Sequence, residues 1–394
     1  MQTSIELTRL ELSRTTVSEK KARLGQFLTP ATTASFMASL FTNGTGPCQL
    51  LDAGAGIGSL SAAFLERWRT GALGFSSVAV DAFEVDPSLH PHLVHTLARY
   101  AGIANLSSRV RADDFVRVAV DALTGALFQE PLGPYTHAIL NPPYKKMHSG
   151  SAQRADLRRA GIETVNLYSA FVALAVALSA DNGEVVAIIP RSFCNGPYYR
   201  PFRDFILDRA ALSHIHLFDA RNKAFREDKV LQENVILRLV CGAAQRSVTV
   251  TTSKDDRFDD LAVRECSYDE IVKPSDPERF IHIPAGAPCT ATTYPGGRPV
   301  HSPRTRATGV NRTCRGLSAS RASPRHARTG SGPATLPSAL HRVARRLAAA
   351  QVQEAERDHG QRGDREVALS DGLLLRRAPL LVEGGAPQSG GHRL

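Results

Sequence analysis

Up to about Pro284 the chain alternates short strand-like segments with longer helix-like segments, and this alternation restricts the fold more than any other feature. The apolar runs Cys48–Ala53, Val78–Glu84 and Tyr135–Leu140 are short, as buried strands are. Ser59–Arg69 has helical character and lies between the first two of them. Strands that alternate with helices build a largely parallel sheet with helices on both faces, so we predict an α/β fold.

The same pattern continues along the chain. Further strands are expected at Val110–Ala112, Glu184–Ile189, Leu212–Leu217 and Val230–Cys241, and further helices at Leu167–Ala180 and Tyr198–Ala210. A helix is also expected to open at Pro87, since proline is tolerated in the first helical turn. The sequence shows no internal repeat.

The composition changes abruptly at residue 285. From Ala285 to the end there are 17 Arg and no Lys against 7 Asp and Glu, which accounts for the whole net charge of +10. The remainder of the chain is therefore balanced in charge, and its basicity does not by itself indicate a nucleic-acid-binding core. The segment also lacks Ile, Phe, Trp and Met, and Tyr294 is its only aromatic residue. So little bulky apolar material predicts a disordered tail.

These features divide the chain into predicted parts. They are an N-terminal helical segment at 1–24, a catalytic domain at 25–245, the start of a linker or recognition region at 246–284, and a low-complexity tail at 285–394. The charged N-terminus has no apolar core, so we do not expect a signal peptide, and the longest apolar run is too short to span a bilayer. The 6 cysteines form no CxxC pair, which favours a cytoplasmic protein without a metal site.

A glycine-rich turn, Leu51–Gly58, follows the first strand. Gly54 and Gly56 permit a sharp turn and a close approach of a ligand, although a structural turn alone would also explain them. The spacing fits neither the Walker pattern nor the dinucleotide fingerprint. Asp52 would disfavour a phosphate and attract an amino group. Glu84, at the end of the second strand, is either a solvated loop carboxylate or an acceptor for ribose hydroxyls. Together these residues favour an adenosine cofactor.

The most specific motif is Asn141-Pro142-Pro143-Tyr144, directly after the strand His137–Leu140. The prolines hold the turn rigid at a sheet edge where ligands bind. Transfer to an adenine amine is difficult because the nitrogen lone pair is delocalised into the ring. The Asn141 amide oxygen and the Pro142 carbonyl would accept the two N–H bonds and aim the lone pair at the electrophile. The Tyr144 ring would stack on an extruded base.

These motifs resemble the amino-methylating DNA methyltransferases over roughly Lys21–Pro284. The resemblance implies a class I S-adenosylmethionine-dependent methyltransferase fold, S-adenosylmethionine as cofactor, and the N6 amine of adenine in DNA as acceptor. It assigns to cofactor binding Phe27, Thr29, Pro30, Asp52, Ala53, Gly54, Gly56, Glu84, Asp114 and Phe115. Asp113 is the alternative to Asp114, because the stretch before Asn141 is longer than in the smallest members of the family.

Phe218–Phe225 and Val230–Asn234 resemble more specifically the Eco57I-type branch that contains the PstI and BsuBI modification enzymes. This resemblance implies that Phe225, or else Phe218, packs on the other face of the flipped adenine; core packing is the alternative for both. It also implies the modification half of a restriction–modification system, with a cognate restriction endonuclease encoded nearby. No nuclease motif precedes Gly25.

Other functions stay open on sequence grounds. Methylation of protein glutamine uses a similar motif, but Gly25–Pro30 and Phe218–Asn234 argue against it. RNA adenine methylation and a remnant that only binds cofactor are further alternatives. Members of the family continue into a target-recognition domain, which this tail cannot supply. We expect the tail from about Ala285 to be a frameshift product, because the composition is that of an off-frame GC-rich gene. With permitted codons for Leu373–Glu383, another reading frame also encodes a segment that resembles the recognition domain of the same family. A naturally disordered tail is the alternative.

Overall fold

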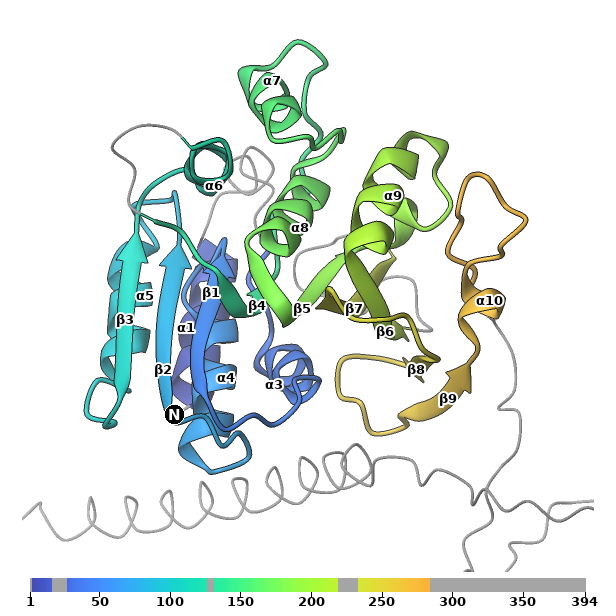
Figure 1. Cartoon of the computed structure of the whole chain (residues 1–394). Coiled ribbons are helices and arrows are strands. Elements are labelled where there is room, and N and C mark those ends of the chain that lie inside the picture. Colours follow the sequence, from blue (N-terminus) through green and yellow to red (C-terminus); the bar gives the residue numbers. More distant parts are fainter. Residues whose placement is uncertain (1, 16–26, 126–130, 219–232, 284–394) are drawn as a thin grey trace, which may run out of the picture. The chain divides into compact units, whose positions relative to one another are not determined.

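The computed structural model describes residues 2–15, 27–125, 131–218 and 233–283 (Figure 1). Its strands are β1 (Pro47–Ala53), β2 (Ser77–Phe83), β3 (Leu106–Arg111), β4 (Tyr135–Leu140), β5 (Ser179–Pro190), β6 (Ala210–Phe218), β7 (Asn234–Cys241), β8 (Val248–Ser253) and β9 (Ala262–Cys266). Within the described residues they form one 9-stranded sheet in the order β3-β2-β1-β4-β5-β7-β6-β8-β9.

The first five strands in chain order run parallel, whereas β7 is antiparallel to both β5 and β6. The strand order reverses between β1 and β4. At such a reversal the crossovers leave to opposite sides, so the carboxyl ends of the two strands border a crevice where ligands bind. In Figure 1 the carboxyl ends of β1, β2 and β3 point upward.

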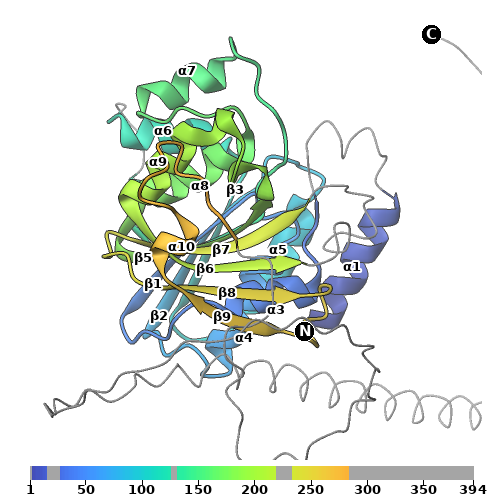
Figure 2. The same ribbon diagram turned by 90° about the vertical axis from the view of Figure 1, so that its right-hand side faces the viewer.

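Helices cover both faces of the sheet. They are α1 (Gln2–Thr15), α3 (Ala31–Ser39), α4 (Ser59–Arg69), α5 (His90–Ala98), α6 (Phe115–Leu123), α7 (Ala152–Arg159), α8 (Leu167–Ala177), α9 (Arg200–Arg209) and α10 (Tyr268–Ile271). Figure 2 shows α6, α8 and α9 on one side of the sheet and α1, α3, α4 and α5 on the other, in agreement with their mutual packing. None of the described helices combines the length and the apolar character that a membrane-spanning helix needs.

The expected elements agree closely with the structure where the local pattern is strong, and differ where side chains redirect the backbone. α4 and β4 begin and end at the expected residues. α5 begins at His90 instead of Pro87, because Asp86 Oδ1 accepts hydrogen bonds from the Ser88 nitrogen (3.0 Å) and hydroxyl (2.7 Å) and holds a turn there. α8 ends at Ala177, ahead of the expected Ala180, and the chain passes directly into β5.

Residues 246–283 continue the sheet, so the expected change of region at 246 is not visible in it. β8 pairs in parallel with β6, and β9 pairs antiparallel with β8. Val248 and Val250 are buried and alternate with threonines, which is the period of a half-buried strand. Of the expected N-terminal helical segment, α1 is described. The tail at 285–394 lies outside the described residues, and its disorder and frameshift origin stay predictions.

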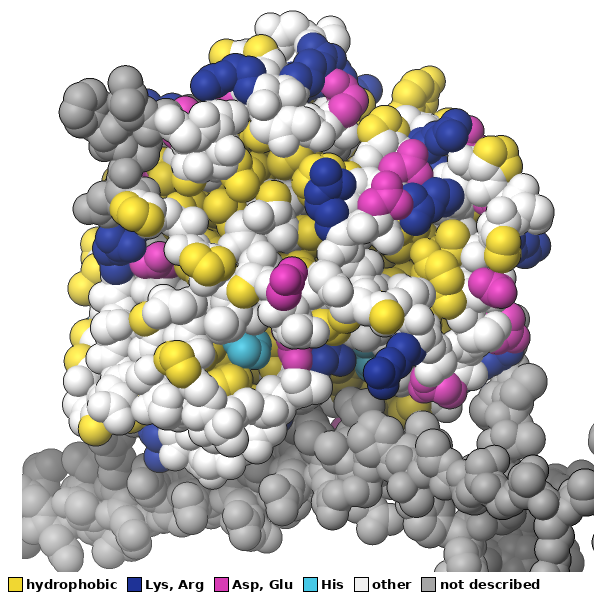
Figure 3. Space-filling model, viewed as in Figure 1, with side chains coloured by type: hydrophobic (Ala, Val, Ile, Leu, Met, Phe, Trp, Pro, Cys, Tyr) yellow, Lys and Arg dark blue, Asp and Glu magenta, His cyan; other side chains and the backbone are white. Residues whose placement is uncertain are grey.

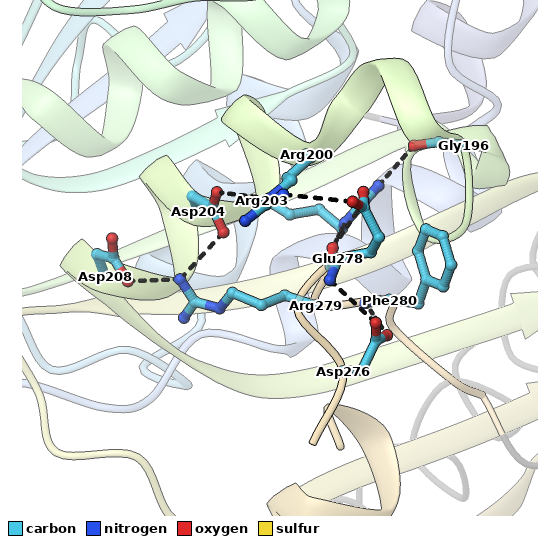
Figure 4. A network of polar contacts seen from close by, with 9 residues as sticks. All are labelled: Gly196, Arg200, Arg203, Asp204, Asp208, Asp276, Glu278, Arg279 and Phe280. Carbon is cyan, nitrogen blue, oxygen red and sulfur yellow. Dashed lines mark hydrogen bonds and ion pairs between the residues drawn. The ribbon is translucent and has the colours of Figure 1, made fainter. Parts of the chain in front are cut away.

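The last described residues are held against α9 by a buried arginine (Figure 4). The Arg203 side chain is 0% exposed. Its Nε and Nη2 donate to the Glu278 carbonyl at 2.9 and 2.7 Å, and its Nη1 donates to the carbonyls of Phe193 (2.9 Å) and Gly196 (2.7 Å). One guanidinium therefore joins the loop that follows β5 to the segment around Glu278. The Ile281 nitrogen adds a backbone bond of 2.9 Å to the Cys194 carbonyl.

The surface seen in Figure 3 has charged and apolar areas close together. Lys and Arg side chains gather at the top of that view, where α7 lies, and hydrophobic side chains are exposed in the hollow below them. Arg158 and Arg159 of α7 form ion pairs with Glu163 and Asp156, at 2.5 and 3.2 Å. Such exposed pairs contribute little to stability.

Candidate active site

A cavity of about 570 Å³, open space at its mouth included, lies at the carboxyl ends of β1, β2 and β4. It is lined by Phe27, Leu28, Gly54, Gly56, Phe83, Glu84, Val85, Asp113, Phe115, Asn141, Pro143 and Phe171. The cavity is at the reversal of strand order, where the fold favours ligand binding.

The glycine turn forms one wall of the cavity and is tied to the end of β2. The nitrogens of Gly54 and Ala55 both donate to the Phe83 carbonyl, at 2.9 and 2.8 Å. Gly56 has φ +59°, and a Cβ on it would lie 3.1 Å from Leu28 Cδ2. A larger residue would therefore be strained and would crowd the wall. Ala53, the last residue of β1, is buried beneath the turn.

Glu84 is buried and connects the glycine turn to the loop after β2. Its Oε2 accepts from the Gly56 nitrogen at 2.8 Å, and its Oε1 accepts from the Asp86 nitrogen at 2.7 Å. Burial raises the pKa of this carboxyl, and the two backbone donors oppose that rise. Each carboxylate oxygen has further lone pairs. Glu84 is thus a fixed acceptor in the wall of the cavity.

Asp52 lies under the turn and is not among the residues that line the cavity. Its Oδ2 accepts from the Ser61 nitrogen (3.1 Å) and hydroxyl (2.6 Å), which satisfies a donor in the first turn of α4. Its Oδ1 is buried and has no hydrogen-bond partner among the described residues. Burial raises the pKa of Asp52 from 3.8 to about 7, against the lowering effect of Ser61.

The structure separates the roles of the two adjacent aspartates after β3. Asp113 lines the cavity, at 3.6 Å from Arg111. Asp114 instead caps α6, because its Oδ1 accepts from the Val116 nitrogen at 2.9 Å. Asp114, which the sequence predicts to bind the cofactor, therefore lies outside the cavity lining. Its neighbour Asp113, the alternative, lines the cavity. Phe115 is buried and does line the cavity, as expected.

Asn141 directly follows β4, and the nitrogen of its side-chain amide is held by hydrogen bonds. Its Nδ2 donates to the Phe27 carbonyl at 2.7 Å and to the Thr29 hydroxyl at 2.9 Å. Its Oδ1 is buried and has no hydrogen-bond partner among the described residues. A buried acceptor without a donor is uncommon and calls for an explanation. An incoming N–H donor in the cavity would supply the missing bond.

The rest of the N-P-P-Y loop forms a rigid border beside this amide. Pro142 is buried, and Pro143 lines the cavity. The Tyr144 hydroxyl donates to the Ile188 carbonyl at 3.2 Å, and its ring centre lies 5.4 Å from that of Phe27. Burial raises the pKa of the Tyr144 phenol, so this ring stays neutral.

Phe225 and Phe218 are the two aromatic residues expected on the second face of an adenine. Phe225 lies outside the described residues. Phe218, the alternative, packs 4.7 Å from His216 and 5.8 Å from Phe258, and it is not in the cavity lining. Pro30, expected at the cofactor, is the residue that precedes α3.

Several lining residues were not expected from the sequence, namely Leu28, Phe83, Val85 and Phe171. Val85 is 52% exposed and follows Glu84. Its position just after the end of β2 could have predicted that it lines the cavity. Phe171 gave no such signal. It lies on α8, whose residues Tyr168–Val176 are all buried, and an all-apolar helix has no periodicity that singles out one side chain.

Comparisons with known proteins agree with this fold. Residues 133–225, which include the N-P-P-Y loop, match the family described as Eco57I restriction-modification methylase. The chain is 47% identical over 283 residues to the type II methyltransferase M.BsuBI of Bacillus subtilis, covering 70% of this chain and 56% of that protein. It is 40% identical over 280 residues to M.PstI of Providencia stuartii, covering 69% and 54%. The chain therefore spans about half the length of the curated relatives that it matches.

A solved structure shares the fold. A crystal structure described as the modification subunit of a type I restriction enzyme from Vibrio vulnificus superposes with a TM-score of 0.50 at 14% identity, covering 65% of this chain and 58% of that one. Such a low identity concerns the fold alone. With its strand order and its cavity at the β1/β4 reversal, the described part of the chain has the class I S-adenosylmethionine-dependent methyltransferase fold, and residues 133–225 are similar to the Eco57I-type restriction–modification methylases.

Proposed function

We propose that this chain transfers a methyl group from S-adenosylmethionine to the N6 amine of adenine in DNA, as the modification half of a restriction–modification system. The observation that carries the proposal is the Asn141 amide. Its nitrogen donates to the Phe27 carbonyl and to the Thr29 hydroxyl, and its buried oxygen has no hydrogen-bond partner among the described residues. An acceptor of this kind in the wall of a cavity suits an amine that must be bound through its N–H groups.

The residues present fit the proposed cofactor. The Gly54–Gly56 turn leaves space that a Cβ would fill, and Glu84 offers a fixed carboxylate beside it. Asp113, Val85 and Phe115 form the adjoining wall. We propose that Glu84 accepts from the ribose hydroxyls and that Phe27 and the glycine turn border the methionine end. When bound, S-adenosylmethionine supplies an electrophilic methyl group.

Asn141 would act on the acceptor nitrogen. Its Oδ1, together with the Pro142 carbonyl, accepts hydrogen bonds from the amine and so draws the nitrogen lone pair out of conjugation. As the N–CH₃ bond formed and the S–CH₃ bond broke, with S-adenosylhomocysteine as the leaving group, the nitrogen would gain positive charge, and these acceptors would stabilise that charge more strongly than they stabilise the neutral amine. The extra proton on nitrogen then leaves to solvent. Tyr144 would border the adenine and hold it outside the duplex, as enzymes that modify bases require.

DNA is favoured over the other acceptors by the relatives. Both M.BsuBI and M.PstI are named type II methyltransferases, and the matched family is one of restriction–modification methylases. The cognate restriction endonuclease and the extrusion of the adenine belong to the same proposal.

The experiment that tests this function is methyl transfer from labelled S-adenosylmethionine, with DNA, RNA and release-factor protein as parallel acceptors. Because the chain spans about half of its relatives, we expect slow labelling and a long incubation at high DNA concentration. Label should appear as N6-methyladenine in digested DNA. In Asn141→Ala we expect a decrease of roughly 10²–10³-fold, as for other groups that stabilise transition-state charge.

Asn141→Ala is also the control for cofactor binding. Asn141→Ala should bind S-adenosylmethionine as the parental chain does in calorimetry, because Asn141 is proposed to act on the acceptor. Label that appears in RNA or in protein glutamine, and not in DNA, would contradict the proposed substrate. Undiminished DNA labelling by Asn141→Ala would contradict the proposed catalytic role.

A further inference from the structure

The Asn141 amide does not orient itself. A side-chain amide at the end of a strand can turn about its last bond, and its nitrogen and oxygen then exchange places. Only one of the two orientations presents the oxygen to an amine. The other presents N–H groups to N–H groups, which cannot bond. The orientation of the Asn141 amide therefore decides whether the site can bind an amine.

Two groups far away in the sequence hold the amide nitrogen, and the Phe27 carbonyl makes the selection because it can only accept. The Phe27 carbonyl and the Thr29 hydroxyl oxygen lie 2.7 and 2.9 Å from Asn141 Nδ2, across 114 and 112 residues of chain. A backbone carbonyl can only accept a hydrogen bond. It would repel the amide oxygen in the reversed orientation, and it would equally repel a carboxylate. The contact thus favours asparagine over aspartate at position 141.

Thr29 is itself held firmly in place. It is 5% exposed and directly precedes Pro30, whose carbonyl accepts from the Ala34 nitrogen at 2.9 Å to begin α3. The Ala31 nitrogen, in the first turn of α3, donates to Glu6 Oε2 of α1 at 3.0 Å. Contacts within α3 and a contact from α1 therefore fix the start of α3. Because Thr29 lies directly before this start, its hydroxyl is held in position to contact Asn141.

We infer that Thr29 is a positioning residue for the catalytic amide: with the Phe27 carbonyl, it holds Asn141 so that Oδ1 is presented to the acceptor amine. The sequence assigns Thr29 to the cofactor, so this role is different from the expected one. The inference rests on the proposed function, because it explains how the amide of that reaction is oriented.

The test compares Thr29→Val, which keeps the shape and removes the hydroxyl, with Thr29→Ser, which keeps the hydroxyl. We expect Thr29→Val to lower kcat for DNA methylation by about 10-fold, the equivalent of one hydrogen bond. The Kd for S-adenosylmethionine in calorimetry should stay within about 2-fold, since no cofactor contact is lost. Thr29→Ser should retain the parental kcat. A rise in Kd with an unchanged kcat would return Thr29 to the cofactor and overturn the inference.

A second measurement does not depend on turnover. The side-chain amide protons of Asn141, identified in nitrogen-15 NMR spectra by their loss in Asn141→Ala, should shift and exchange faster with solvent in Thr29→Val but not in Thr29→Ser. Unchanged amide signals in Thr29→Val would overturn the inference even if methylation were confirmed. If the parental chain methylated no DNA and the amide signals still changed, the proposed function would fail while the contact stood.

Asn141→Asp completes the set. A carboxylate is the stronger acceptor, and on that ground alone this variant would be active. The Phe27 carbonyl has no donor to meet in this variant, so we expect kcat to decrease by about 10²-fold or more. Parental activity in Asn141→Asp would show that the donor contacts do not matter, and the inference would be wrong.

Discussion

Two buried polar regions of this molecule differ in whether their polar atoms have hydrogen-bond partners. Around Arg203, all three guanidinium nitrogens reach backbone carbonyls, and the segment at Glu278 is closed against α9. At the carboxyl ends of β1 and β4, Asn141 Oδ1 and Asp52 Oδ1 are buried without a partner among the described residues. Satisfied networks stabilise a fold, whereas an acceptor left open in a cavity costs stability and is kept for a ligand. The difference supports the cavity region as the candidate site.

The largest expected effect breaks the satisfied region. Arg203→Met should decrease the free energy of unfolding by roughly 3–5 kcal/mol, because several buried carbonyls lose their donor at once. The measurement is urea unfolding followed by circular dichroism. Arg200→Met is the matched control: Arg200 is on the same helix, is 47% exposed and forms only surface ion pairs, so we expect a change of about 0–1 kcal/mol. Equal stabilities of the two variants would remove the contrast between the regions.

A smaller effect is expected within the site. Glu84→Ala leaves the Gly56 and Asp86 nitrogens without their carboxylate and should weaken S-adenosylmethionine binding by roughly 1–3 kcal/mol in calorimetry. Asp114→Ala is the control from the same side of the cavity. It should lower stability by about 1 kcal/mol through the lost helix cap and leave the cofactor Kd unchanged. If Asp114→Ala weakened binding as much as Glu84→Ala, the division between Asp113 and Asp114 would be wrong.

A third expected effect is a slope of the unfolding free energy with pH. Burial raises the pKa of Asp52 from 3.8 to about 7, so between those values the folded state binds a proton that the unfolded state has released. The stability contributed by this group is therefore lost as pH rises through that window, by roughly 1.4 kcal/mol per pH unit. Asp52→Asn should remove this slope.

The comparison of Asp52→Asn with the parental chain must be made at each pH. Buried His137 and His214 have pKa values lowered to about 4 and 3, and their contribution has the opposite sign: stability is lost as pH falls below 6.5. Both chains carry these histidines, so the difference between the two unfolding free energies isolates Asp52. A difference that stays constant from pH 4 to 7 would contradict the assigned pKa.

The local parts of the fold could be predicted because their signals are local. β4 is an apolar run that ends at a proline pair, and α4 follows a glycine turn, so their limits are readable from neighbouring residues. β8 carries the alternation of valine and threonine that is typical of a strand, but its partner β6 lies elsewhere in the chain. Because pairing depends on that partner, the place of β8 in the sheet cannot be read from its own residues.

The sequence by itself determined which chemical groups this protein carries and in what order: the glycine turn, the acid after β2 and the N-P-P-Y loop, each at the end of a strand. Only the tertiary structure decided how they act. It placed Asp113 in the cavity and Asp114 on the helix, and it brought Phe171 into the wall. It also set the Asn141 amide by contacts with Phe27 and Thr29. The physical reason is that a hydrogen bond depends on distance and direction in space, and segments more than a hundred residues apart meet only when the sheet has formed.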